Sequence, residues 1–247
     1  MPKINKVVAT VWYNKQDMRT LRQVFPDAQF VYVDFFDKKK LADEVKDADV
    51  AILMGDVDSC LLGENTLQWI HCDHAGLNGS ARPEVFARGI PVTGAAGRSA
   101  PVLAEHCIYF MLQSCYHTKE LLAAQAKGQW GVSGMNAWRG LYGRTAGIVG
   151  LGNNGCMLAE RLHAFGMKLI GYNKFPIRGL DYLDRKLCAQ SGDTLDPLLK
   201  QSDFVILTLA LTDETYHMID KAALAKMKPG AFLVNMARGG IVCTEDL

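Results

Sequence analysis

Residues 145–165 read "TAGIVGLGNNGCMLAERLHAF" and decide the fold. The first part is an apolar run typical of a buried strand, and the last part has the apolar spacing of an amphipathic helix. Between them lies Gly150-Leu151-Gly152-Asn153-Asn154-Gly155, a G-x-G-x-x-G pattern. Because it follows a strand and opens a helix, this pattern predicts a dinucleotide-binding turn.

Each glycine of this turn has a separate physical role. Gly150 permits the tight turn, Gly152 lets the backbone approach a pyrophosphate, and Gly155 lets helix and strand pack closely. The N–H groups at the helix start, at Asn153 and Asn154, are then free to bind the anion. The alternative is a glycine-rich strand–helix turn without a ligand.

The end of the next strand bears on which dinucleotide binds. Such units carry an acidic residue there that holds the adenosine ribose. This chain has Asn173 instead, followed by Lys174 and Arg178. A carboxylate would repel a 2′-phosphate, whereas these side chains would accept it. The sequence therefore favours NADP(H) slightly over NAD(H); in the alternative, Asn173 hydrogen-bonds the ribose of NAD.

The rest of the chain alternates strands and helices. Before the glycine-rich turn, strands are expected at residues 7–12, 28–35, 49–55, 67–73 and 89–94. A second series begins at Thr145. Strands that alternate with helices form parallel sheets covered on both faces. We therefore expect an α/β protein of two Rossmann-like, doubly wound parallel-sheet domains, residues 1–98 and 99–247, the second incomplete at its C-terminus.

Residues 99–127 join the two series and have helical periodicity without an internal glycine. They predict one long helix. Because it is apolar on more than one face, we expect either a buried connector or an interface helix. The segment that follows, up to Arg144, is rich in glycine and tryptophan and is interpreted as an ordered excursion.

The composition argues against several classes of protein. Lys plus Arg number 27 and Asp plus Glu 26 in 247 residues, so no excess charge points to nucleic acid or anionic lipid. The longest apolar run, from His106, is too short to span a bilayer, and the N-terminus has no signal-peptide pattern. The seven cysteines are dispersed without a C-x-x-C pair, which favours reduced thiols in a cytoplasmic protein and no metal site.

Several longer motifs resemble one family. "RGLYGRTAGIVGLGNNG", "HAFGMKLIGYNKFP", "LTLALTDETYHMID" and "MKPGAFLVNMARGGIV" follow one another in the order found in the D-isomer-specific 2-hydroxyacid dehydrogenases. "LQWIHCDHAGLNG", "ARGIPVTG" and "VLAEH" resemble the substrate domain of the same family. The resemblance implies a flavodoxin-like substrate-binding domain over residues 1–98 and an NAD(P)-binding Rossmann domain over residues 99–247, with the active site between them.

The resemblance also implies an activity and its residues. Family members transfer a hydride between NAD(P)H and a 2-keto acid or D-2-hydroxy acid, and an arginine of an N-x-x-R-G motif is catalytic. This motif places the role on Arg238, whose guanidinium can hold the substrate carboxylate and polarise the carbonyl. The alternative for Arg238 is a salt-bridged surface residue. Further cofactor contacts are implied for Leu209, Ala210, Thr215 and Ala237.

Two loops of the first domain are expected to hold the substrate carboxylate. By resemblance, the backbone N–H groups that do so belong to Met54 and Gly55 and to Ala75 and Gly76. The two glycines suit a close backbone approach. Ordinary turns at the ends of strands are the alternative. Formate is disfavoured as a substrate, because Ala96 stands where formate dehydrogenases have an asparagine.

The family also uses a glutamate and a proton-donating histidine, which would fall beyond Leu247. We therefore interpret the chain as C-terminally truncated and expect it to bind a dinucleotide but to reduce 2-keto acids very slowly. A catalytically dead NAD(P)-binding interaction or regulatory protein is the alternative function. The histidines present are interpreted as structural, and His74 is the best outside candidate for a proton donor.

A homodimer is implied by the same resemblance. Its interface is expected to include the helix that begins near Ser99 and the segment around Trp130 and Trp138. Tryptophans are enriched at interfaces, although core packing is an equal alternative for these two.

Overall fold

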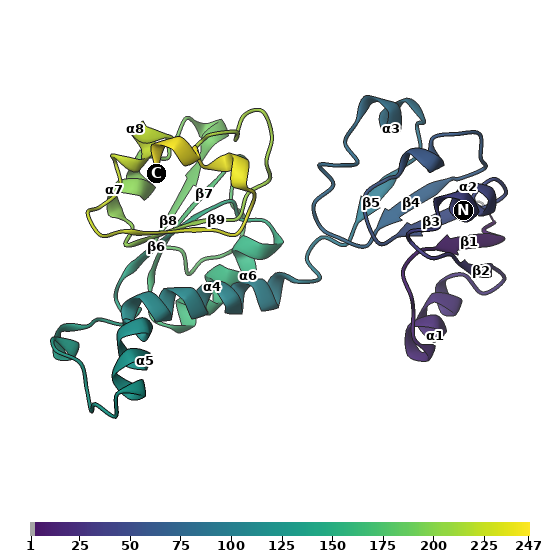
Figure 1. The fold of residues 1–247 in the computed structure, drawn as a ribbon. Helices are drawn as coiled ribbons and strands as arrows, with labels where there is room; N and C mark the ends of the chain where they lie inside the picture. The colour runs from purple at the N-terminus through teal and green to yellow at the C-terminus, as the bar shows by residue number, and fades with distance from the viewer. Residues whose placement is uncertain (1–2) are drawn as a thin grey trace. The chain divides into compact units, whose positions relative to one another are not determined.

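The computed structural model describes residues 3–247, and the chain divides into two compact units, one ending at Arg98 and the other beginning at Ser99 (Figure 1). Each unit contains a five-stranded sheet of its own, and all strand pairs in both sheets are parallel. The predicted α/β class with two parallel sheets is confirmed. Within the described residues no helix has the length and apolar character needed to cross a membrane.

The first unit is built around a sheet of order β2-β1-β3-β4-β5. Its central strand is wholly buried, as a strand covered on both faces should be. The strands are β1 (Lys6–Ala9), β2 (Gln29–Tyr32), β3 (Val50–Leu53), β4 (Trp69–Cys72) and β5 (Val92–Gly94). The helices are α1 (Lys15–Val24), α2 (Lys38–Glu44) and α3 (Pro83–Ala87).

The second unit has a sheet of order β10-β9-β6-β7-β8. Its strands are β6 (Thr145–Val149), β7 (Lys168–Asn173), β8 (Arg185–Cys188), β9 (Phe204–Leu207) and β10 (Phe232–Asn235). Its helices are α4 (Ala100–Cys115), α5 (Thr118–Ala126), α6 (Asn153–Ala164), α7 (Asp196–Gln201) and α8 (Lys221–Leu224). Strand β8, which begins with the exposed charged residues Arg185 and Lys186, is not among the strands that the sequence predicts.

The strand order of the second unit creates a topological switch point at β6. Strand β7 follows β6 in the chain and pairs with one side of it, whereas β9 pairs with the other side. Crossovers on either side of such a strand leave a crevice at its carboxyl end, where ligands bind in open α/β sheets. The glycine-rich turn begins at this end of β6.

The prediction of a single helix over residues 99–127 is wrong. The helix ends at Cys115, and α5 begins at Thr118 after His117, whose φ of 46° is left-handed. The imidazole of His117 stacks on Trp138 with ring centroids 4.7 Å apart. The contact lies at the break between α4 and α5, where a continuous helix had been expected, and periodicity does not reveal it.

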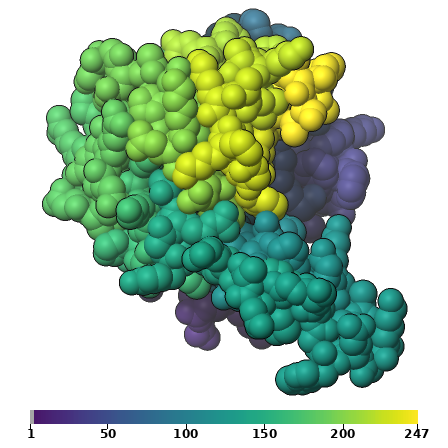
Figure 2. All heavy atoms as spheres, turned by 90° about the vertical axis from the view of Figure 1, so that its left-hand side faces the viewer, coloured from purple at the N-terminus to yellow at the C-terminus, as the bar shows by residue number. Residues whose placement is uncertain are grey.

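The two helices differ in their packing. Helix α4 buries Ala104, Cys107 and Met111 in the same core cluster as Leu158 and Leu162 of α6. Helix α5 buries only Ala124. Helix α5 and the loop that follows it project from the body of their unit, visible in teal in Figure 2, whereas Leu141 near the start of β6 is buried in the core. Helix α4 therefore buries one face in the core and leaves another exposed, whereas α5 is largely exposed.

An aspartate placed just before a strand recurs in both sheets. Asp49 precedes β3 and accepts hydrogen bonds from the backbone N–H groups of Asn5 and Lys6, at 2.6 and 3.1 Å. Asp203 precedes β9 and accepts one from Thr145 N–H at 2.8 Å, at the start of β6. These carboxylates satisfy N–H groups that the neighbouring strand leaves unpaired at its first residue.

The pKa of Asp203 is lowered in the fold. Partial burial alone would raise it, but the hydrogen bond from Thr145 and the nearby Lys228 ammonium, 3.0 Å away, outweigh burial. A carboxyl group whose folded pKa lies below its ordinary value of 3.8 stabilises the fold only while it is ionised.

Replacing Asp203 by Asn should therefore lower the free energy of unfolding at pH 7 by about 1 kcal/mol, because Thr145 and Lys228 lose a charged partner. The stability from this charge is present above the ordinary pKa and is lost as the pH falls through the lower folded pKa. Urea unfolding of both proteins at pH 7 and in acid measures this. A deficit of equal size at both pH values would contradict the role given to the charge.

Candidate functional site

A cavity of about 480 Å³ lies at the carboxyl ends of β6, β7 and β9. Many of the residues that the sequence predicts for a dinucleotide site line this cavity. Those that line it are Gly150, Gly152, Asn173, Lys174, Leu209, Ala210 and Thr215. The predicted residues that do not line it are Asn153, Asn154, Gly155, Arg178, Ala237 and Arg238.

The three glycines of the turn are required for different reasons. Gly150 has a left-handed φ of 98°, and a Cβ there would lie 2.7 Å from the backbone nitrogen of Leu209. A Cβ on Gly155 would overlap the carbonyl oxygen of Gly150, so this glycine lets α6 start against the end of β6. A Cβ on Gly152 would meet no atom within 4 Å. The fold therefore does not explain Gly152, whereas a ligand that approaches its backbone does.

Thr208 fastens the turn to the neighbouring strand. Its hydroxyl donates to the carbonyl oxygens of Val149 and Gly150, so the loop after β9 is held beside the turn. Thr208 also lines the cavity. It is not among the residues that the sequence predicts, and it directly follows β9, at the carboxyl end of that strand.

The amide of Asn173 is hydrogen-bonded at both ends, to the glycine-rich turn and to the segment after β7. Its Oδ1 accepts from Leu151 N–H at 3.3 Å, and its Nδ2 donates to the carbonyl oxygen of Phe175 at 3.1 Å. An aspartate could accept the first bond but not donate the second. The asparagine therefore fixes the end of β7 without placing a carboxylate at this strand end.

Lys174 does not extend freely into solvent. Its Nζ lies 2.6 Å from Oε2 of Glu214, a residue of the loop between β9 and α8 that also lines the cavity. Arg178 is exposed and forms no ion pair with a described residue. Sequence reasoning paired Lys174 with Arg178 and overlooked Glu214, although Glu214 directly precedes the predicted contact Thr215.

The loop that carries Glu214 is held by Thr215. The Thr215 hydroxyl donates to the carbonyl oxygen of Ala210 at 2.8 Å and accepts from Thr212 N–H at 2.8 Å. These bonds form a closed turn within the loop itself. One wall of the cavity is thus formed by a single hydrogen-bonded loop, which includes Leu209, Ala210 and Thr215.

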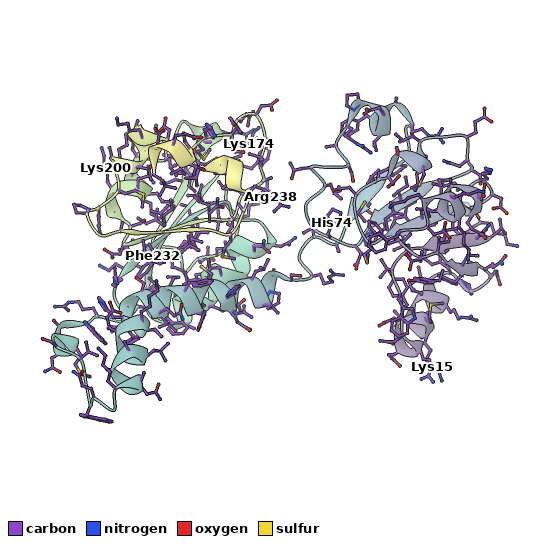
Figure 3. All side chains as sticks on the ribbon, viewed as in Figure 1. Lys15, His74, Lys174, Lys200, Phe232 and Arg238 are labelled. Atoms are coloured by element: carbon purple, nitrogen blue, oxygen red, sulfur yellow. The ribbon has the colours of Figure 1, made fainter. Side chains whose placement is uncertain are left out.

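Arg238 follows β10, and in Figure 3 its side chain lies on the same side of the unit as Lys174. The residue is exposed, and its Nη1 donates to the carbonyl oxygen of Ala237 at 2.8 Å. Asn235 Nδ2 donates to the Arg238 carbonyl at 2.9 Å, which braces the turn. Over residues 3–247 no carboxylate forms an ion pair with Arg238, so the guanidinium retains its capacity to bind an anion.

The predicted substrate loops lie at the carboxyl ends of two paired strands of the first unit, β3 and β4. Met54 N–H donates to Thr10 Oγ1 at 2.9 Å and is therefore already engaged. Gly55, Ala75 and Gly76 donate no backbone hydrogen bond to a described residue. These three N–H groups are the ones that remain available to an anion.

His74 lies next to the second of these loops (Figure 3). Its Nε2 is 3.7 Å from Oδ1 of Asp56, is buried, and has no hydrogen-bond partner within the described residues. Asp56 Oδ1 also accepts from Ser80 Oγ at 2.6 Å. Within the second unit, residues 99–247, no hydrogen bond or ion pair joins a histidine to Arg238. The described residues of the chain contain no group of three metal-binding side chains.

Two alanine substitutions should separate the turn's structural and binding roles. Gly152→Ala places a methyl group in open space, so Tm should stay nearly unchanged while dinucleotide affinity falls about tenfold. Gly155→Ala should lower stability by about 2 kcal/mol, because the methyl group collides with a backbone oxygen. Thermal unfolding and dinucleotide titration of both variants measure this. Unchanged affinity in Gly152→Ala would contradict the assignment of Gly152 to ligand binding.

Comparison with known proteins connects this geometry to a family. Residues 108–247, more than half of the chain, match the sequence model described as "D-isomer specific 2-hydroxyacid dehydrogenase, NAD binding domain". The match contains the glycine-rich turn, all the residues that line the cavity, and Arg238.

Individual relatives agree with this match. A hydroxypyruvate reductase of Thermotoga maritima is 36% identical over 65% of this chain and 50% of its own length. A glyoxylate reductase of Thermococcus onnurineus is 32% identical over 98% of this chain and 74% of its own length. A D-lactate dehydrogenase structure from Aquifex aeolicus, complexed with NAD and lactic acid, is 26% identical with a TM-score of 0.75, covering 98% of this chain and 72% of that one.

The extent of these matches differs between this chain and its relatives. Against the first curated relatives the chain spans about half of their length. The family model nevertheless covers more than half of the chain, and the Thermococcus relative aligns over nearly all of it. The chain belongs to the D-isomer-specific 2-hydroxyacid dehydrogenase family.

Proposed function

We propose that this protein is an oxidoreductase that transfers a hydride between NAD(P)H and a 2-keto acid or D-2-hydroxy acid. The single observation that carries the proposal is Gly152, a glycine that lines the cavity and that the fold itself does not require. Family membership supports the nicotinamide dinucleotide as the ligand. When bound, the nicotinamide supplies or accepts the hydride.

The residues of this chain would hold the cofactor in a consistent way. The turn at Gly150 and Gly152 and the start of α6 would receive the pyrophosphate, because helix N-termini offer unpaired N–H groups. The loop from Leu209 to Thr215 would contact the adenosine half. Lys174 lines the cavity and could bind a 2′-phosphate, which supports a slight preference for NADP(H) over NAD(H).

We further propose that Arg238 binds the substrate. Its guanidinium can form paired hydrogen bonds with a carboxylate and can polarise the neighbouring carbonyl that receives the hydride. The unpaired state of Arg238 within the described residues supports this role. The free N–H groups of Gly55, Ala75 and Gly76 are the other proposed carboxylate donors.

The described residues do not identify the proton donor of this reaction. Reduction of a keto group needs an acid that protonates the forming alkoxide, and no described histidine of the second unit is hydrogen-bonded or ion-paired to Arg238. This observation favours the second candidate function, an NAD(P)-binding protein with little catalytic activity. Both candidates require dinucleotide binding.

The 247-residue polypeptide should therefore bind NADPH or NADH in calorimetry and turn over glyoxylate, hydroxypyruvate or pyruvate very slowly. Arg238→Gln should leave dinucleotide affinity unchanged but weaken keto-acid binding to the dinucleotide complex about tenfold or more, because a charged hydrogen-bonding partner is lost. Brisk loss of the nicotinamide absorbance with any of these acids would overturn the expectation of slow turnover. If neither dinucleotide binds, both candidate functions are wrong.

We propose a homodimer formed through α4, α5 and the segment that follows. Tyr109 and Leu122 are 54% and 58% exposed, and Trp130 is fully exposed. Trp138 is half-buried against His117. Neither tryptophan lies in a core cluster, which argues against core packing as their role and supports an interface.

Leu122→Glu should convert the dimer to a monomer, because a charge would be buried in an apolar contact. Val24→Glu is the matched control, since Val24 is 65% exposed on α1 and outside the proposed interface. Sedimentation equilibrium of the three proteins gives the masses. A monomeric native chain, or a dimer that persists in Leu122→Glu, would contradict this interface.

A further inference from the structure

One ion pair spans the candidate dinucleotide cavity. Lys174 directly follows β7, and Glu214 lies forty positions later in the loop between β9 and α8. Their Nζ and Oε2 atoms are 2.6 Å apart, and both residues line the cavity. The side chains are 54% and 68% exposed, so the pair lies where the cavity opens to solvent.

The backbones on both sides are held independently of this ion pair. The carbonyl oxygen of Lys174 accepts from Gln190 N–H at 3.1 Å. The loop of Glu214 is closed by the Thr215 hydroxyl, which bonds Ala210 and Thr212. Breaking the ion pair therefore requires only side-chain rotation. Lys174 can change partners while both walls of the cavity stay in place.

The charges that line this end of the cavity are few. Asn173, at the position where an acid would select against a phosphate, has both amide ends engaged with the backbone. Lys174 and Glu214 are the charged residues among those that line the cavity. The other ion pairs of this unit, such as Lys226 with Asp196 at 2.6 Å, involve no lining residue.

We propose that Glu214 sets the preference between NADP(H) and NAD(H) by competing with the 2′-phosphate for the Lys174 ammonium. The inference rests on the proposed dinucleotide binding. A 2′-phosphate is a multiply charged acceptor that attracts an ammonium group strongly. An ion pair as exposed as this one is weak, so the phosphate can displace it.

Displacing Glu214 from Lys174 costs free energy, and only binding of NADP(H) requires it. Once Lys174 turns to the phosphate, the Glu214 carboxylate has lost its counter-charge and stands near a second anion. NAD(H) carries a hydroxyl group at this position and leaves the ion pair intact. Glu214 therefore lowers the affinity for NADP(H) selectively, and removing its charge should shift the preference further towards NADP(H).

The test is a cycle of titrations on the full chain, with NADPH and NADH followed by nicotinamide fluorescence at low salt. Glu214→Gln should tighten NADPH binding about tenfold and change NADH binding by less than about twofold, because only the phosphate competes for Lys174. Lys174→Gln should weaken NADPH binding about tenfold. In the double variant, Glu214→Gln should have almost no effect on NADPH. High salt should shrink all these differences.

Asp196→Asn is the matched control, since it breaks an ion pair of the same length that lies outside the cavity. Its NADPH-to-NADH affinity ratio should equal that of the native chain. The inference is overturned if Glu214→Gln changes both affinities equally, or if its effect persists without Lys174, which would indicate direct repulsion and not competition. Failure of the native chain to bind either dinucleotide would overturn the proposed function and this inference together, whereas either of the first two results leaves the proposed function standing.

Discussion

The contact between the start of α6 and the end of β6 is the constraint on which the rest of the second unit depends. A Cβ at Gly155 would overlap the Gly150 carbonyl oxygen, and a Cβ at Gly150 would press on the backbone of Leu209. The helix can start this close to the strand because Gly155 has no side chain, and the loop after β9 can lie this close to the turn because Gly150 has none. The close start keeps the turn, the end of β7 and the loop after β9 around one cavity.

The polar groups around this cavity serve two purposes that are easily confused. Thr208, Asn173 and Thr215 hold one backbone segment to another. Gly152 and the side chains of Lys174 and Glu214 line the cavity and do not join backbone segments to one another. Because these segments are held together without the ligand, binding does not require loops to become ordered, and less binding free energy is lost.

The two units share one hydrogen-bonding arrangement at the amino edges of their sheets. In each, an aspartate that precedes one strand accepts hydrogen bonds from the first N–H groups of its neighbour, Asp49 in the first unit and Asp203 in the second. Parallel sheets leave such N–H groups without partners at their amino edge. The opposite, carboxyl edges carry the glycine-rich turn, Arg238 and the loops at Gly55 and Gly76.

The sequence by itself determined the fold class, the strand that precedes the glycine-rich turn, and the family, because periodicity and motif spacing are local properties of the chain. It also placed Lys174 and Arg238 at strand ends. The tertiary structure alone decided which charges meet. Glu214 lies forty positions from Lys174, His117 at the helix break stacks on Trp138, and the amide of Asn173 is engaged by two backbone segments. These are contacts between distant or adjoining segments that no pattern along the chain encodes, and they arise only when the strands take their places in the sheet.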